Sequence, residues 1–151
     1  MDKPTFVYTT YITTTPERLW QALTDPAFTG RYWGATFATD WQKGSPMTWD
    51  MLGLRFESPE QVVLESDPPR RLVHTLRCSW SEDVVAEGTS RVTWEIEQVG
   101  DSCCLTLTHD QLRDGCNPQV YGGWPMVLSG LKTWLETGEE LTTPGSLMYK
   151  T

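Results

Sequence analysis

The sequence predicts an α+β fold with an antiparallel sheet of six or seven strands, two short helices after the first strand, and one long C-terminal helix. Three observations predict it. A strand-like run is followed by two helix-start signals, apolar and polar residues alternate through much of residues 36–107, and apolar residues recur at helical spacing after Asn117. With 151 residues, the chain is expected to form one hydrophobic core.

The first strand and both short helices are predicted from local signals. Residues 6–12, which read FVYTTYI, have strand composition because they are all aromatic or β-branched. Thr-Pro at 15–16 and Asp-Pro at 25–26 each place a capping oxygen before a proline at the first helical position, where the missing N–H costs nothing. These signals predict helices at 16–24 and from 26 to about 33.

Most of the remaining strands are expected as successive hairpins. Lys43-Gly44 supplies a tight turn, and Pro68-Pro69 ends a strand because proline cannot donate to a strand ladder. The clearest half-buried strand is 91–97, where Val, Trp and Ile alternate with charged residues and Thr. The expected strands after the first are 36–42, 45–52, 61–66, 71–78, 91–97 and 103–109.

The last expected element is a long helix that begins with the Asn117-Pro118 capping pair and ends at Gly138, a residue suited to a left-handed C-cap. Pro125 lies within it and is expected either to kink the axis or to delay the start of regular helix. Residues 1–138 are therefore expected to form a single domain, with 139–151 as a flexible C-terminal tail.

Composition excludes several classes of function. The net charge of −8 disfavours nucleic acid binding, and no apolar run approaches the ~20 residues of a membrane span. The N-terminus shows no secretory signal, so a cytoplasmic location is expected. No phosphate-binding loop or zinc spacing occurs, so neither a cofactor nor a metal is expected, and the four cysteines are expected to be reduced thiols.

The aromatic content is unusual for a small core. The chain contains eight Trp, five Tyr and four Phe, which supply more flat apolar surface than a small core needs. Trp41, Trp80 and Trp134 are expected at the surface, where they would form a dimer patch or cover the mouth of a pocket. The chain is therefore expected to be a monomer or a homodimer.

Several motifs resemble those of a known family in the same order along the chain. They are TPERLWQALTDP at 15–26, DPPRRL at 67–72, SRVTWE at 90–95, LTLTH at 105–109, and GWP at 123–125 followed by Leu131-Lys132. The chain resembles the homologues of the C-terminal domain of the heat-shock protein 90 ATPase activator, within the START-like (SRPBCC) superfamily. The resemblance covers about residues 5–138.

The resemblance implies a helix-grip fold, in which a curved sheet wraps around the long helix and leaves an apolar cavity in many relatives. A non-catalytic protein that binds a small apolar or aromatic ligand in that cavity is the leading hypothesis. The residues expected to line the site are Met47, Trp49, Met51, His74, Leu76, Trp94, Leu105, Leu107, Trp124 and Leu128. The alternative is that these residues fill a solid core.

Two other functions stay open. The resemblance implies a chaperone partner, as an interaction module that stimulates a heat-shock protein 90 type ATPase. Cyclase-like or hydrolase-like enzymes of the wider superfamily suggest acid–base chemistry, for which Glu65, His74 and His109 are the candidates if they converge. Otherwise Glu65 is expected to pair with Arg70 or Arg71 at the surface.

Overall fold

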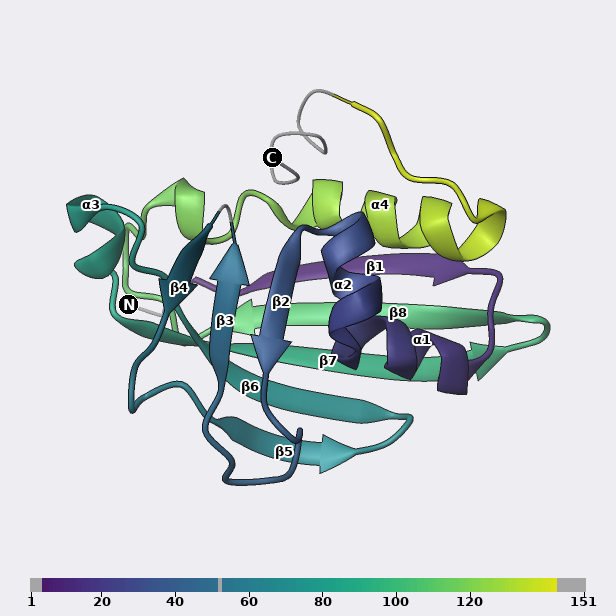
Figure 1. Cartoon of the computed structure of the whole chain (residues 1–151), viewed down its shortest axis with the longest axis horizontal. Helices are drawn as coiled ribbons and strands as arrows, with labels where there is room; N and C mark the ends of the chain where they lie inside the picture. The colour runs from purple at the N-terminus through teal and green to yellow at the C-terminus, as the bar shows by residue number, and fades with distance from the viewer. Residues whose placement is uncertain (1–3, 52, 144–151) are drawn as a thin grey trace.

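The computed structural model describes residues 4–51 and 53–143, and Figure 1 shows the whole chain. The elements in chain order are β1 (Phe6–Ile12), α1 (Pro16–Thr24), α2 (Pro26–Tyr32), β2 (Ala35–Ala38), β3 (Thr48–Met51), β4 (Leu54–Phe56), β5 (Val63–Asp67), β6 (Arg71–Arg77), α3 (Glu82–Val85), β7 (Thr89–Val99), β8 (Ser102–Asp110), the 3₁₀ turn η1 (Pro118–Val120) and α4 (Trp124–Thr137).

The strands form two antiparallel sheets. The larger has the order β1-β8-β7-β6-β5, and the smaller has the order β2-β3-β4. The small sheet crosses in front of the large one, α1 and α2 cover the same face, and α4 runs alongside β1 (Figure 1). This confirms the α+β helix-grip fold, but the described strands lie in two sheets where the sequence predicts six or seven in one. The additional strand, β4, is too short to show an alternating pattern.

Backbone hydrogen bonds join the two sheets where β3 and β5 begin. Val63 N donates to Ser45 O at 3.0 Å, and Met47 N donates to Gln61 O at 2.9 Å. Pro46 forms an isolated bridge with Val62 at the same place. The chain therefore bends from one sheet into the other without a long connecting loop.

Gln61 lies where the two sheets join, and its side chain is fully buried. Its Oε1 accepts hydrogen bonds from Trp49 Nε1 at 3.2 Å and from the backbone N of Arg77 at 2.8 Å. Its Nε2 donates to the carbonyl oxygens of Met47 at 3.4 Å and Phe56 at 3.3 Å. One amide thus links β3, β4 and β6.

The helix caps follow the sequence signals. The Thr15 hydroxyl caps α1 by accepting from Arg18 N, and the Asp25 carboxylate caps α2 by accepting from Ala27 N. Pro125 lies in the first turn of α4, so it delays the start of regular helix instead of kinking it. Gly138 ends α4 with φ of 77°, in the left-handed conformation that glycine adopts freely.

Residues 139–143 follow α4, and the rest of the predicted tail, residues 144–151, lies outside the described residues. Glu140 forms an ion pair with Arg31 of α2, with its Oε1 3.5 Å from Arg31 Nε. Thr143 Oγ1 lies 3.2 Å from Met126 Sδ of α4. Even these first tail residues contact the folded domain.

The two faces of the large sheet differ as the alternation predicts. On β7, Val92, Trp94 and Ile96 are buried, and Glu95 and Glu97 are exposed. The outer face carries ion pairs between neighbouring strands, including Arg71 Nε to Glu65 Oε2 at 2.8 Å. No helix in the described part of the chain is both long and apolar enough to cross a membrane.

We expect Gln61→Met to lower the free energy of unfolding by roughly 3 kcal/mol, because the Trp49 indole and the Arg77 amide would each lose a buried acceptor. Urea unfolding followed by tryptophan fluorescence measures this. The control is Gln21→Met on the exposed face of α1, which should change stability by no more than about 0.5 kcal/mol. If Gln61→Met lowered the free energy of unfolding by less than about 1 kcal/mol, the Gln61 side chain would not be what stabilises the connection between the two sheets.

Candidate functional site

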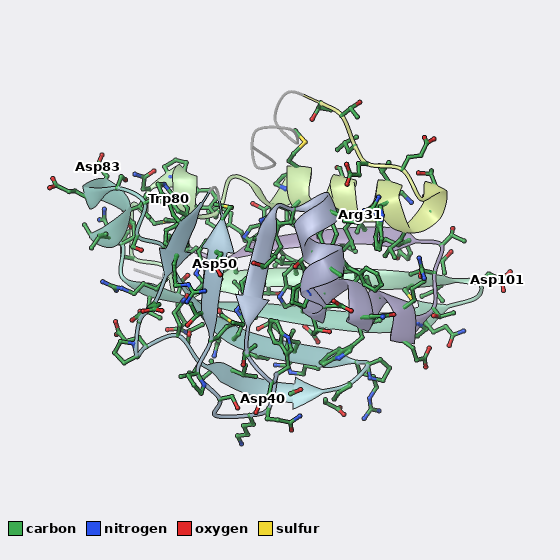
Figure 2. All side chains as sticks on the ribbon, in the orientation of Figure 1. Arg31, Asp40, Asp50, Trp80, Asp83 and Asp101 are labelled. Atoms are coloured by element: carbon green, nitrogen blue, oxygen red, sulfur yellow. The ribbon has the colours of Figure 1, made fainter. Side chains whose placement is uncertain are left out.

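The candidate site is an apolar cavity of about 60 Å³ between the N-terminal end of α4, the small sheet and the end of β6. Four of the predicted residues line it: Trp49, Met51, Leu76 and Trp124. The remaining lining residues are Trp33, Cys78, Trp80, Val120, Gly123 and Val127. Trp80 lies near α3, at the opposite end of the molecule from Asp101 (Figure 2).

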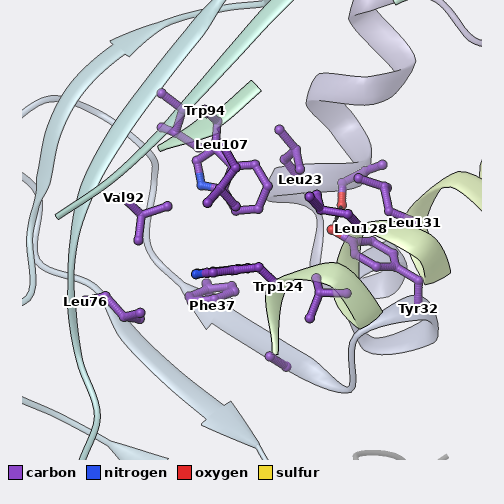
Figure 3. Packing of buried hydrophobic residues seen from close by; sticks show 14 of the residues in the cluster. Leu23, Tyr32, Phe37, Leu76, Val92, Trp94, Leu107, Trp124, Leu128 and Leu131 are labelled. Carbon is purple, nitrogen blue, oxygen red and sulfur yellow. Dashed lines mark hydrogen bonds between the residues drawn. The ribbon is translucent and has the colours of Figure 1, made fainter. Parts of the chain in front are cut away.

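Aromatic rings form a continuous series of contacts along this cavity. Trp94 meets Trp124 edge to face, with ring centroids 5.6 Å apart, and Trp124 meets Trp33 at 5.4 Å. The contacts continue from Trp33 to Phe37, then to Trp49, Phe56 and Trp80. Figure 3 shows Trp94 and Trp124 reaching toward each other from the sheet and the helix. Each contact adds about 0.5–1.5 kcal/mol beyond simple burial.

The Trp94 indole is hydrogen-bonded to a buried histidine on the neighbouring strand. Trp94 Nε1 lies 3.0 Å from His74 Nε2, and His74 Nδ1 lies 2.8 Å from the carbonyl oxygen of Thr75. Because an indole N–H can only donate, His74 Nε2 must accept and Nδ1 must carry the proton. His74 is therefore held as one neutral tautomer.

A second indole and histidine pair joins α4 to the sheet. Trp124 Nε1 donates to His109 Nδ1 at 3.0 Å, and His109 Nε2 lies 2.7 Å from Ser90 Oγ. Ser90 Oγ in turn donates to the carbonyl oxygen of Leu76 at 3.2 Å. His109 is thus neutral with its proton on Nε2, the opposite tautomer to that of His74.

Burial makes both histidines poor bases. Desolvation lowers the pKa of His74 to about 4, although its bond to the Thr75 carbonyl opposes the shift. Desolvation also lowers the pKa of His109 to about 4, and the nearby His74 adds to this effect. All four ring nitrogens already have partners within the protein, so the histidines form part of the scaffold around the cavity.

The other predicted site residues are buried in the core around the cavity and do not line it. They are Met47, His74, Trp94, Leu105, Leu107 and Leu128. Trp80, expected in a dimer patch or over the mouth of a pocket, lies in the lining. The lining residues that sequence reasoning missed are Trp33 after α2, Cys78 after β6, Val120 and Gly123 before α4, and Val127 within α4. Val127 could have been found, since it follows Trp124 by three positions on the same helix face.

The structure does not bring the three acid–base candidates together. Glu65 is exposed on the outer face and pairs with Arg71, whereas His74 and His109 are buried on the inner face. Trp134, expected at the surface, is also buried, because it packs against Phe28 and Tyr32 of α2. Across residues 4–51 and 53–143, no cluster of three or more His, Cys, Asp or Glu side chains is suited to a metal ion.

Stability is expected to fall as the pH drops from 6.5 toward 4. In this window the unfolded histidines take up protons and the folded ones, with pKa values of about 4, do not. Stability is therefore fully present above pH 6.5. Two histidines together should cost about 2–3 kcal/mol between pH 7 and pH 5.5. Urea unfolding at a series of pH values measures this slope.

The matched variant is His109→Asn, which keeps an acceptor for Trp124 and does not titrate in this range, so it should show about half the slope. Imidazole ¹⁵N chemical shifts would check the two tautomers directly. Constant stability between pH 7 and pH 5.5, or a full slope in the variant, would be inconsistent with two neutral buried histidines.

Solved structures with this fold come from several organisms. The Aha1 dimer from Colwellia psychrerythraea is similar with a TM-score of 0.70 and 19% identity, over 90% of this chain and 98% of that chain. A protein from Mesorhizobium loti has a TM-score of 0.73 and 21% identity, over 87% and 96% of the two chains. No curated protein sequence matches.

The sequence itself matches a protein family over most of its length. The model for Activator of Hsp90 ATPase homolog 1-like proteins matches residues 13–136. That range contains every motif from the Thr15-Pro16 cap to Leu131-Lys132. The chain therefore belongs to the family of Activator of Hsp90 ATPase homolog 1-like proteins.

Proposed function

We propose that this protein binds a small, uncharged aromatic or acyl ligand in the cavity beside α4, without catalysing a reaction. The observation that supports it is the lining, which combines four indoles with aliphatic side chains, a methionine and a thiol, and includes no charged residue among those that the structure describes. Such a surface gains free energy from apolar burial and offers little to a charged group.

Two of the polar groups in the cavity wall already have hydrogen-bond partners within the protein. The indole N–H groups of Trp49 and Trp124 donate to Gln61 and His109, so they point into the protein's own hydrogen-bond network. Burial raises the pKa of the Cys78 thiol to about 12, which keeps it protonated and unreactive. The ligand would therefore be held by shape and ring contacts.

The size of the cavity limits what can enter without rearrangement. At about 60 Å³ it is smaller than the ~300–1,000 Å³ typical of pockets for drug-sized molecules. A ligand larger than a few heavy atoms requires the walls to move. Trp33 and Trp80 are the lining indoles that are only partly buried, so moving them uncovers less buried surface than moving Trp49 or Trp124.

The proposal places the protein in the cytoplasm. Cys78, Cys103, Cys104 and Cys116 are all free thiols, as is usual in a reducing compartment. The dimer described for the Colwellia psychrerythraea protein also makes a homodimer of this chain a candidate, which sedimentation analysis would check.

Filling the cavity should stabilise the protein and abolish binding. Cys78→Leu adds carbon atoms to the lining, and at about 24 cal/mol per Å³ a filled 60 Å³ cavity is worth up to about 1.4 kcal/mol. We expect the variant to lose binding of the uncharged fluorescent probe N-phenyl-1-naphthylamine, measured by fluorescence titration. Cys104→Leu, on the outer face of β8, is the matched control and should bind as the wild type does.

Two results would count against the proposal. One is probe binding that Cys78→Leu leaves unchanged, since the probe would then bind elsewhere. The other is a wild-type protein that shows neither probe fluorescence nor a thermal shift with any member of a library of apolar compounds.

A second candidate function is stimulation of a heat-shock protein 90 type ATPase, which family membership favours. The outer sheet face, with Arg71 and Arg91 among its charged residues, is the proposed contact surface. Arg71→Glu combined with Arg91→Glu should reduce stimulation of the cognate chaperone at least tenfold in a steady-state ATPase assay. Cys78→Leu is the control and should keep full stimulation. Absence of stimulation by excess wild-type protein would rule this function out.

A further inference from the structure

Two chain segments that are far apart in sequence both contribute to the lining of the cavity. The segment after β6 contributes Cys78 and Trp80, then forms α3 and reaches Glu87 before β7 begins. The segment between β8 and α4, residues 111–123, contributes Val120 and Gly123. Separating these two segments would widen the cavity between them.

Glu87 joins the two segments through its carboxylate. Its Oε1 accepts from Arg113 Nη2 at 2.8 Å and from the backbone N of Asn117 at 3.0 Å, and its Oε2 lies 2.7 Å from Arg113 Nε. The Glu87 side chain is only 4% exposed, whereas that of Arg113 is 55% exposed. One carboxylate thus holds both a side chain and the backbone of the opposite segment.

One oxygen of the Glu87 carboxylate is buried without an aligned hydrogen bond. No aligned hydrogen bond reaches the buried Oε2 of Glu87 within the described residues, although Arg113 Nε lies close to it. The neighbouring guanidinium lowers the pKa of Glu87, so the carboxylate is charged at neutral pH. Opening the connection would let water hydrate this oxygen, which offsets part of the cost of breaking the ion pair.

The two ends of α4 differ in how firmly they are held. At the C-terminal end, Lys132 Nζ donates to the carbonyl oxygen of Tyr11 at 2.7 Å and Glu136 Oε2 accepts from Thr13 N at 2.8 Å. At the N-terminal end, Gly123 supplies no side-chain cap, but Trp124 is anchored to His109. Motion that enlarges the cavity is therefore easiest in the residues that precede Trp124, in the segment that Glu87 holds.

We propose that the ion pair between Glu87 and Arg113 is a clamp that holds the two lining segments together and sets the rate at which ligand enters the cavity. This inference rests on the proposed binding function for its ligand, but the closure itself can be measured without one. The clamp lies outside the cavity, so it controls access and leaves the contacts with a bound molecule unchanged.

The first experiment measures opening by amide hydrogen exchange in Arg113→Ala and Glu87→Gln. Amides in residues 111–127 should exchange roughly tenfold faster than in the wild type. Each variant removes a charge-assisted contact that only the closed state makes, so the free energy of opening falls. Amides of β7 and β8 should keep their wild-type rates, which would show that each variant is folded. Arg70→Ala, which removes an exposed ion pair with Asp67 far from the cavity, is the control.

The second experiment measures association of N-phenyl-1-naphthylamine by stopped-flow fluorescence. The association rate should rise roughly tenfold in Arg113→Ala and by an intermediate amount in Arg113→Lys, which keeps the charge but not the guanidinium contacts with both carboxylate oxygens. If both Arg113→Ala and Glu87→Gln show the same exchange and association rates as the wild-type protein, the clamp is overturned. Faster exchange in a protein that binds no probe would instead support the clamp and overturn the binding function.

Discussion

The edge-to-face contact between Trp94 and Trp124 is the interaction on which the rest of the structure depends. Each indole is fixed at its other end by a histidine, Trp94 by His74 and Trp124 by His109. Through Ser90 this network reaches β6, β7, β8 and α4 with every ring nitrogen paired. Because leaving one of these buried groups unpaired costs about 1–3 kcal/mol, α4 has only one favourable position against the sheet.

This constraint explains where the cavity lies. Around the Trp94 and Trp124 pair, fixed rings and aliphatic side chains fill the space between the sheet and α4. Toward α3 the aromatic contacts continue through the small sheet, but the opposite wall is the turn before α4, held by Glu87. The aromatic contacts therefore extend from the hydrogen-bonded pair of Trp94 and Trp124 to the cavity lining, where Trp33 and Trp80 are only partly buried.

Local signals predicted the elements that short-range chemistry decides. Pro16 and Pro26 fixed the starts of α1 and α2, Gly138 fixed the end of α4, and alternation identified the buried face of β7. The break into two sheets could not be predicted, because it depends on Gln61, a lone polar residue whose partners are up to 16 positions away. The cavity was only partly predictable for the same reason. Trp124 lies on a predicted helix face, but Trp33 and Cys78 reach the lining only through the tertiary fold.

The bonds that hold the end of α4 also bear on aggregation. β1 is an edge strand, and such strands can template the addition of a strand from another chain. Lys132 and Glu136 occupy the Tyr11 carbonyl and the Thr13 amide, and a charged pair beside an open edge discourages intermolecular pairing. A chain with so many aromatic residues is thus protected from strand addition at the C-terminal end of β1.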